Sequence, residues 1–173
     1  MVTRLFKANQ AAKERGFTLS ELLATVSIVG ILSAIALPKY TNQMERTRQN
    51  SMAASMEQLL IRIVSSKEEI GLPPKTWKDL SDQAVIMTKS GPVSDSDGRL
   101  EKEINLSDGN YLTKRIGDLT DDNYFILEAS VLQSPDRNVL GCIDLSTGAS
   151  DVKLGVVHSK TSTKAEKSDL ICR

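Results

Sequence analysis

Residues 17–37 read FTLSELLATVSIVGILSAIAL, an apolar stretch of 21 residues in which Glu21 is the one ionisable side chain. As an α-helix this stretch would be about 31 Å long, which matches the hydrocarbon thickness of a bilayer. A charge at this depth costs about 2.5–3.5 kcal/mol on insertion scales, so the presence of Glu21 calls for a functional reason. We therefore expect residues 17–37 to form a membrane-spanning helix.

The segment before this stretch is a short basic leader. Residues 1–16 carry a net charge of +3, from Arg4, Lys7, Lys13 and Arg15 against Glu14. The rest of the chain has 18 basic and 21 acidic residues and no net positive charge. The positive-inside rule places the leader in the cytoplasm and the body outside. An acidic body also argues against a dedicated nucleic-acid site.

A secretory signal peptide is an alternative interpretation of the same N-terminus. Its parts would be the basic leader, the apolar run and a small-residue cleavage site at Ala34-Ile35-Ala36. The run is longer than the usual apolar core of about 7–15 residues, and it contains Glu21. These features favour a retained membrane helix and leave the secreted form as the second possibility.

Residues 16–21, GFTLSE, follow the basic leader and open the apolar run. Over residues 13–45 the chain resembles the type IV prepilins, in which a membrane aspartic protease cuts after the glycine and methylates the new amine. The resemblance implies cleavage between Gly16 and Phe17 and N-methylation of Phe17. It also implies that Gly30 loosens the helix and that Pro38 kinks it. Ser20 departs from the family, which usually has an apolar residue there.

The same resemblance makes Glu21 the residue that guides assembly. A carboxylate in lipid requires a counter-charge, which we do not expect its own helix to supply. The amine of Phe17 on an adjacent subunit would meet this need. The implied partners are copies of the chain or other pilins, the prepilin peptidase and the inner-membrane assembly machinery. The implied location is the inner membrane first and then a fibre on the cell surface.

Beyond Pro38, residues 38–70 continue as an amphipathic helix. Apolar residues recur at helical spacing and predict one buried stripe: Met52, Met56, Leu59, Leu60, Ile63 and Val64. Gly71 and the pair Pro73-Pro74 end the pattern. We expect a helix over residues 17–70, with a bend or local melting at Pro38.

Residues 71–173 are expected to form an extracytoplasmic domain of the α+β class, with the long helix packed on a small antiparallel sheet. We expect loops over residues 71–123, including a solvated turn at residues 95–98, DSDG, which lack the full spacing of a calcium loop. The C-terminal sheet is expected at residues 124–173. Its strands would be residues 124–133, 139–145 and 152–157, separated by turns at residues 134–137 and 146–148.

The two cysteines, Cys142 and Cys172, lie near the C-terminus. Behind an export-type N-terminus, a disulfide between them is favoured over free thiols. It would close a loop of about thirty residues and contribute roughly 3–4 kcal/mol in the entropic model. Pilins commonly close their C-terminal region in this way.

Nothing in the sequence indicates catalysis, a cofactor or a metal site. His158 is the single histidine, and no phosphate-binding loop or metal-spaced cluster occurs. The favoured function is a structural subunit of a fibre for adhesion, twitching motility or DNA uptake. A pseudopilin of a type II secretion system and a secreted soluble domain are the alternatives, and the C-terminal disulfide favours the pilin over the pseudopilin.

Overall fold

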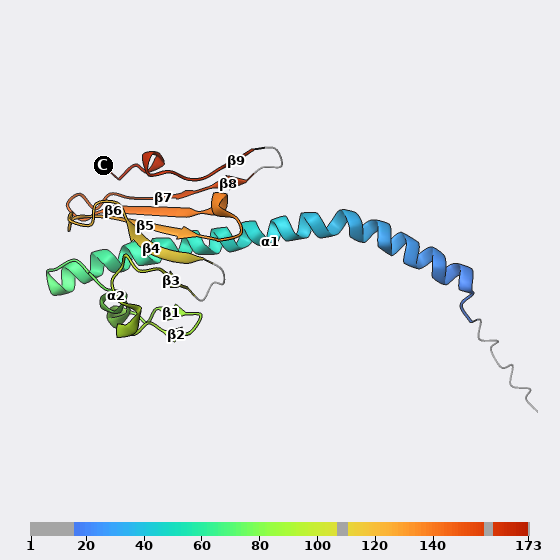
Figure 1. Cartoon of the computed structure of the whole chain (residues 1–173), viewed down its shortest axis with the longest axis horizontal. Helices are drawn as coiled ribbons and strands as arrows, with labels where there is room; N and C mark the ends of the chain where they lie inside the picture. The colour runs from blue at the N-terminus through green and yellow to red at the C-terminus, as the bar shows by residue number, and fades with distance from the viewer. Residues whose placement is uncertain (1–15, 107–110, 158–160, 173) are drawn as a thin grey trace, which may run out of the picture. The chain divides into compact units, whose positions relative to one another are not determined.

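The computed structural model describes residues 16–106, 111–157 and 161–172. The basic leader before Gly16, and His158, therefore lie outside the described residues. The chain forms two compact units, Met1–Asn42 and Gln43–Arg173. One helix, α1 (Leu19–Ile70), contributes to both units, and an antiparallel sheet packs on it within the second (Figure 1). The fold is α+β, as the sequence predicts.

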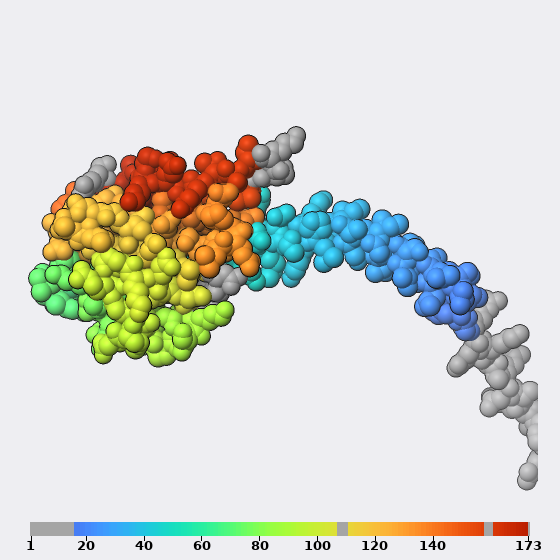
Figure 2. Space-filling view, in the orientation of Figure 1, coloured from blue at the N-terminus to red at the C-terminus, as the bar shows by residue number. Residues whose placement is uncertain are grey.

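In the first unit, the side chains of α1 are not covered by other described residues (Figure 2), and many of these exposed side chains are apolar. Leu22, Val29 and Leu37 are each more than half exposed. A helix that is apolar on all sides is stable when lipid or neighbouring helices cover its surface. Pro38 lies inside α1 without interrupting the helix, so the predicted local melting is not found. The bend at Pro38 remains a prediction.

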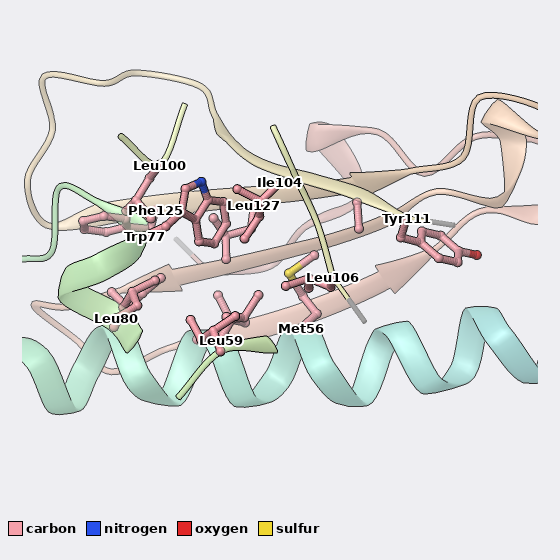
Figure 3. Close-up of a cluster of buried hydrophobic side chains, with 14 of the residues drawn as sticks. Met56, Leu59, Trp77, Leu80, Leu100, Ile104, Leu106, Tyr111, Phe125 and Leu127 are labelled. Carbon is pink, nitrogen blue, oxygen red and sulfur yellow. The ribbon is translucent and has the colours of Figure 1, made fainter. Parts of the chain in front are cut away.

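In the second unit, α1 buries the predicted stripe against the sheet. Met52, Met56 and Ile63 are fully buried, and they pack in one core with Trp77 and Phe125 (Figure 3). Burying a side chain of this size stabilises the fold by about 1.5–3 kcal/mol. The helix ends where the sequence predicts. Gly71 adopts a left-handed φ of 77° and donates its N–H to the Lys67 carbonyl at 2.8 Å.

The main sheet has five antiparallel strands in the order β3-β4-β5-β6-β7. Their bounds are β3 (Ile104–Asn105), β4 (Leu112–Ile116), β5 (Tyr124–Ser130), β6 (Val139–Asp144) and β7 (Ser150–Leu154). The sequence-predicted hairpin is β5 and β6, in which Phe125 pairs with Ile143. Its turn contains the 3₁₀ helix η2 (Pro135–Arg137). One edge of the sheet is β3 and the other is β7.

At Gly141 the sheet lies very close to α1. It lies in the middle of β6, and a Cβ added there would be 2.6 Å from Cγ of Met56 and 3.2 Å from Cδ1 of Leu60. The missing side chain therefore lets the helix lie directly on the central part of the sheet.

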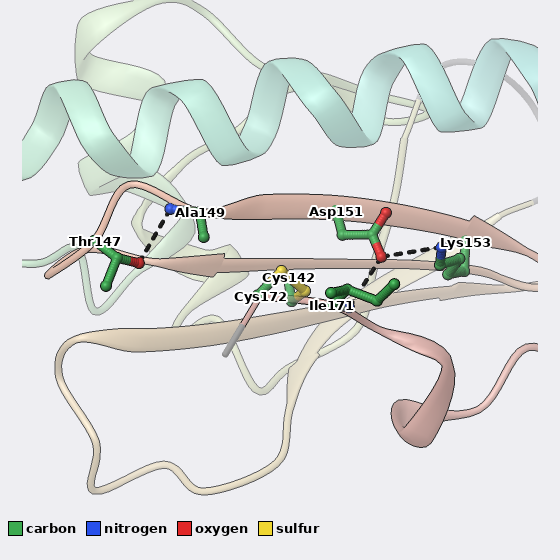
Figure 4. Close-up of a disulfide and its surroundings, with 7 residues drawn as sticks. All are labelled: Cys142, Thr147, Ala149, Asp151, Lys153, Ile171 and Cys172. Atoms are coloured by element: carbon green, nitrogen blue, oxygen red, sulfur yellow. Dashed lines mark hydrogen bonds and ion pairs between the residues drawn. A yellow bond between two sulfur atoms is a disulfide. The ribbon is translucent and has the colours of Figure 1, made fainter.

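The opposite face of the sheet is covered by the C-terminal tail. Ile126 and Cys142 project to this face, and Cys172 and Leu170 pack against them. Cys142 and Cys172 form a disulfide with a Cα–Cα distance of 6.1 Å (Figure 4). The tail includes the 3₁₀ helix η3 (Lys167–Asp169). The disulfide therefore joins β6 to the segment that covers the outer face.

The predicted loop region, residues 71–123, contains regular structure that we did not predict from the sequence. It includes α2 (Trp77–Gln83) and a small hairpin of β1 (Met87–Thr88) with β2 (Gly91–Pro92). It also includes β3 and β4, so the sheet begins well before residue 124. The expected turn at residues 95–98 contains a 3₁₀ helix, η1 (Asp95–Asp97).

The predicted third strand over residues 152–157 is divided at Gly155. β7 ends at Leu154, and Val156 and Val157 form β8 (Val156–Val157), which pairs with β9 (Ser162–Thr163) in a separate sheet. A Cβ on Gly155 would lie 2.0 Å from the carbonyl oxygen of Asp136, so the chain passes too close for a side chain. Gln49 of α1 donates its amide N–H to the Gly155 carbonyl at 2.7 Å.

Candidate processing and assembly site

Gly16 and Phe17 lie in non-helical backbone directly before α1. Both residues are exposed, and the side chain of Phe17 is 83% accessible. A Cβ on Gly16 would have no neighbouring atom within 4 Å in the described structure. The peptide bond between them is therefore accessible, and the chain itself imposes no need for glycine at position 16.

The first turn of α1 is closed by a capping box between Thr18 and Glu21. The backbone N–H and the hydroxyl of Thr18 both donate to Oε2 of Glu21, at 2.9 and 2.7 Å. In return the N–H of Glu21 lies 3.3 Å from the Thr18 hydroxyl oxygen. This reciprocal pattern satisfies helix donors that would otherwise have no partner.

The capping box adds to what the sequence predicts for Glu21. We expected its own helix to supply no counter-charge, and that expectation stays a prediction. What the structure adds is two hydrogen bonds from Thr18 and a position at the positive end of the helix dipole. The Thr-x-x-Glu spacing at residues 18–21 is a readable signal for this motif. Thr18 is therefore the residue that the sequence analysis missed at this site.

Two hydroxyl groups within the apolar part of the helix donate to its own backbone. The hydroxyl of Thr25 donates to the Leu22 carbonyl, and that of Ser27 donates to the Leu23 carbonyl, both at 2.8 Å. Gly30 has no neighbour within 4 Å of an added Cβ, so it lies on an open helix surface. By length and composition α1 is able to cross a membrane, and its apolar window has no buried residues.

Among the described residues, metal-binding side chains form no candidate site. No group of three or more His, Cys, Asp or Glu side chains comes together there in a way that would hold a metal ion. The disulfide between Cys142 and Cys172 belongs to the second unit, as a link in its structure. What the first unit presents is an accessible peptide bond, a capped carboxylate and an uncovered apolar helix.

Comparison with known proteins identifies the same segment. A family model described as the prokaryotic N-terminal methylation motif matches residues 11–37. The chain is 38% identical over 56 residues to the type IV major fimbrial protein FimA of Dichelobacter nodosus, covering 32% of this chain and 35% of FimA. It is 31% identical over 96 residues to the type IV major pilin protein PilE1 of Neisseria gonorrhoeae, covering 56% of this chain and 54% of PilE1.

A third relative, fimbrial protein Q of Moraxella bovis, is 28% identical over 102 residues, which cover 58% of this chain and 63% of the relative. The chain thus matches between about a third and less than two thirds of the length of these relatives. No solved structure matches it. The chain therefore carries the N-terminal methylation motif, and from this part of its sequence it is similar to type IV pilins and fimbrial proteins.

Proposed function

We propose that the chain is a structural subunit of a type IV pilus, assembled through its N-terminal helix into a fibre on the cell surface. The observation that carries this proposal is the methylation motif, which includes the start of a helix whose apolar side chains are exposed in that part of the chain. A helix of this kind gains its burial when it packs among identical helices. The relatives named as fimbrial and pilin proteins support the same function.

In this proposal, prepilin peptidase cleaves between Gly16 and Phe17 and methylates the amine of Phe17. The exposed, non-helical backbone at these residues supports the cleavage, because a peptidase binds an extended segment more readily than a helix. Since an added Cβ on Gly16 meets nothing within the described chain, the requirement for glycine would come from the peptidase. The basic leader would keep this bond on the cytoplasmic side.

Assembly would then add a second partner to Glu21. Before assembly its carboxylate accepts hydrogen bonds from Thr18. In the fibre it would also pair with the amine of Phe17 on an adjacent subunit, and the pair would set the axial register, because a misplaced subunit would leave a charge unpaired. Gly30 and Pro38 would give the helix the local freedom to pack.

The second unit would lie outside the cytoplasm, first at the inner membrane and then on the fibre. A disulfide between Cys142 and Cys172 supports this location, since disulfides persist in oxidising compartments. The proposed partners are copies of this chain or other pilins, the prepilin peptidase and the inner-membrane assembly machinery.

The test is mass spectrometry of the chain purified from sheared surface fibres. We expect a mature N-terminus at Phe17 that carries one methyl group. Gly16→Ala should be cleaved slowly and Gly16→Val more slowly still, with the uncleaved precursor retained in the membrane. A mature chain that begins at Leu37, after the small residues 34–36, would instead assign the protein to the secreted class.

A further inference from the structure

An open groove of about 710 Å³ lies in the second unit between α1 and the edge strand β7. On its helix side, Glu57, Ile61, Val64 and Glu68 line the groove, and each lies about one helical turn after the one before it. Its sheet side is formed by Ser150, Asp151 and Val152 of the edge strand, together with Gly148 and Ile143.

On the helix side of this groove, the apolar side chains of Leu60, Ile61 and Val64 lie between two carboxylates, those of Glu57 and Glu68. On the sheet side, the carboxylate of Asp151 is paired with Lys153. Ile61 is 63% exposed, although it lies on the helix that forms the core. Glu57 and Glu68 are exposed, and along the helix they are separated by about 16 Å. Within the described part of the chain neither has an ion-pair partner. The groove thus presents an apolar surface between two uncompensated negative charges.

A segment with the complementary character lies at β1. Residues 85–89 alternate, with Ile86 and Thr88 buried while Val85, Met87 and Lys89 are exposed. Val85 is 65% and Met87 49% exposed, and Lys89 lies in the turn between β1 and β2. No salt bridge of Lys89 occurs among the residues that the structure describes. This segment therefore presents two apolar side chains followed by one positive charge.

The two surfaces lie on opposite sides of the buried stripe of α1. Gln58 and Arg62 line a second hollow together with Val85 and Met87, whereas Ile61 and Val64 line the acidic groove. Figure 1 shows β1 and β7 on opposite sides of the helix ribbon. One molecule therefore cannot insert its own residues 85–89 into its own groove, but a neighbour could do so.

We propose that the groove between α1 and β7 binds residues 85–89 of a second copy of this chain. This inference rests on the proposed fibre function and names the contact between the folded parts of neighbouring subunits. Two complementary surfaces that face opposite directions form a heterologous interface, which propagates as a filament unless the rotation closes it.

The dimensions of the two surfaces agree. In an extended segment the Val85 and Lys89 side chains are about 13 Å apart, and Ile61 and Glu68 are separated by about 10 Å along the helix. Val85 and Met87 can therefore cover the apolar side chains of the groove while Lys89 pairs with a carboxylate at one of its ends. If the segment runs in one direction along α1, Lys89 pairs with Glu68. If it runs in the opposite direction, Lys89 pairs with Glu57.

The first test is a charge swap in the full chain, with fibre yield measured by shearing. Lys89→Glu should reduce the yield about tenfold, because it places a negative charge against an acidic groove. Adding Glu68→Lys or Glu57→Lys should restore the yield to within about twofold of the unchanged chain, and the restoring partner identifies the direction of the segment. Failure of both partners to restore the yield would overturn the proposal.

Two control variants separate the groove from general effects of charge. Lys75→Glu and Glu69→Lys change exposed residues that line neither surface, and they should leave the yield unchanged. Each variant is also checked for processed subunit in the membrane and for its Cys142–Cys172 disulfide. A loss of yield in the controls equal to that of Lys89→Glu would count against the proposed contact.

The second test is independent of yield. Met87→Cys combined with Ile61→Cys should give a ladder of crosslinked multimers when intact fibres are oxidised. Either single variant should give no ladder. The single variants also show whether an introduced cysteine forms crosslinks by disulfide exchange with Cys142 or Cys172. Fibres that form normally but give no ladder would overturn the groove contact and leave the fibre function intact. A chain that forms no fibres in its unchanged form would instead overturn the proposed function itself.

Discussion

Nε of Arg137 lies 2.8 Å from Oε2 of Glu45, and this ion pair links η2 to α1. The Arg137 side chain is only 6% exposed, whereas that of Glu45 is 44% exposed. The Arg137 carbonyl also accepts a hydrogen bond from the hydroxyl of Tyr111 at 3.0 Å. The pair therefore neutralises a guanidinium that the fold has removed from water.

Glu45→Ala should destabilise the protein, because it leaves the buried Arg137 without its partner. The loss should be about 1–3 kcal/mol, between the values for exposed and fully buried pairs. Thermal unfolding of the full chain in detergent should show a Tm lower by roughly 3–10 °C. Glu69→Ala is the control, since Glu69 is exposed, and its Tm should not change. Equal Tm values for both variants would contradict the structural role of the pair.

Glu21→Gln should leave membrane insertion and cleavage intact while sharply reducing fibre formation. Fibre formation should fall because the amide has no negative charge to neutralise the amine of Phe17 on a neighbouring subunit. Insertion should not suffer, because removing the charge lowers the free-energy cost of placing the helix in the membrane. Immunoblots should show processed subunit in the membrane, and electron microscopy should show few or no fibres.

Thr18→Ala is the matched comparison for Glu21→Gln. It weakens the cap by about 1 kcal/mol and leaves the carboxylate charged. Fibres should therefore persist in Thr18→Ala. If both variants lost fibres to the same extent, helix capping would explain the role of Glu21 and the pairing with Phe17 would be wrong.

Cys172→Ser should release the tail from the outer face of the sheet. The disulfide spans 30 residues, so its loss should cost roughly 3–4 kcal/mol in the entropic model. We expect a lower Tm and faster proteolysis after Val157, with normal membrane insertion. The double variant Cys142→Ser with Cys172→Ser should be equally unstable. If the double variant were as stable as the unchanged chain, the lower stability of Cys172→Ser would come from the free thiol of Cys142 and not from loss of the disulfide.

The carboxylate of Asp151 holds the same tail to β7. It accepts the N–H of Ile171 at 3.0 Å and pairs with Lys153 at 3.2 Å (Figure 4). Burial acts to raise the pKa of Asp151, but the hydrogen bonds from Ile171 and Lys153 outweigh it and hold this pKa below its usual value. A lowered pKa in the folded state means that Asp151 stabilises the fold only where it is ionised.

This stabilisation should be complete above the ordinary carboxyl pKa of about 3.9 and lost as the pH falls through the lower folded value. Asp151→Asn should therefore lower the Tm at pH 7, and its Tm should fall less steeply with acidification than that of the unchanged chain. Thermal unfolding measured at several pH values checks this. Asp82→Asn, at a surface carboxylate that is 65% exposed, should leave the slope unchanged.

The elements that could be predicted from the sequence are those whose buried faces are apolar. Met52, Met56 and Ile63 repeat at helical spacing and are fully buried, so α1 was found with its end at Ile70. The hairpin of β5 and β6 was found for the same reason, because its β-rich runs flank a turn sequence.

Strand β4 was missed because its buried positions are polar. Thr113 and Arg115 face inward, and Arg115 lies over the ring of Phe125, with its guanidinium carbon 3.9 Å from the ring centroid. Arg115 also donates hydrogen bonds to the carbonyls of Asp121 and Tyr124. Alternation of apolar and polar residues therefore could not mark this strand. The β3 strand has two residues, too few for any pattern.

Helix α2 carried a signal that the sequence analysis did not use. Thr76 and Asp79 form a capping box, with the N–H of Asp79 donating to the Thr76 hydroxyl at 3.1 Å. The break at Gly155 depended instead on the backbone of Asp136 passing nearby, and no local pattern reports such a distant neighbour. At the N-terminal site, Gly16, Phe17 and Glu21 were predicted from the resemblance. The cap at Thr18 was missed, although its Thr-x-x-Glu spacing is readable in the sequence.

The hydrogen bond from Gln49 to Gly155 has a mechanical consequence. Along α1 from its N-terminus, Glu45 and Gln49 are the first described side chains bonded to residues remote in sequence. A tensile load drawn through the helix would therefore enter the sheet at this end, where the amide of Gln49 also contacts the Asn138 carbonyl at 3.3 Å. The load would be shared between two backbone segments, at Asn138 directly before β6 and at Gly155 directly after β7.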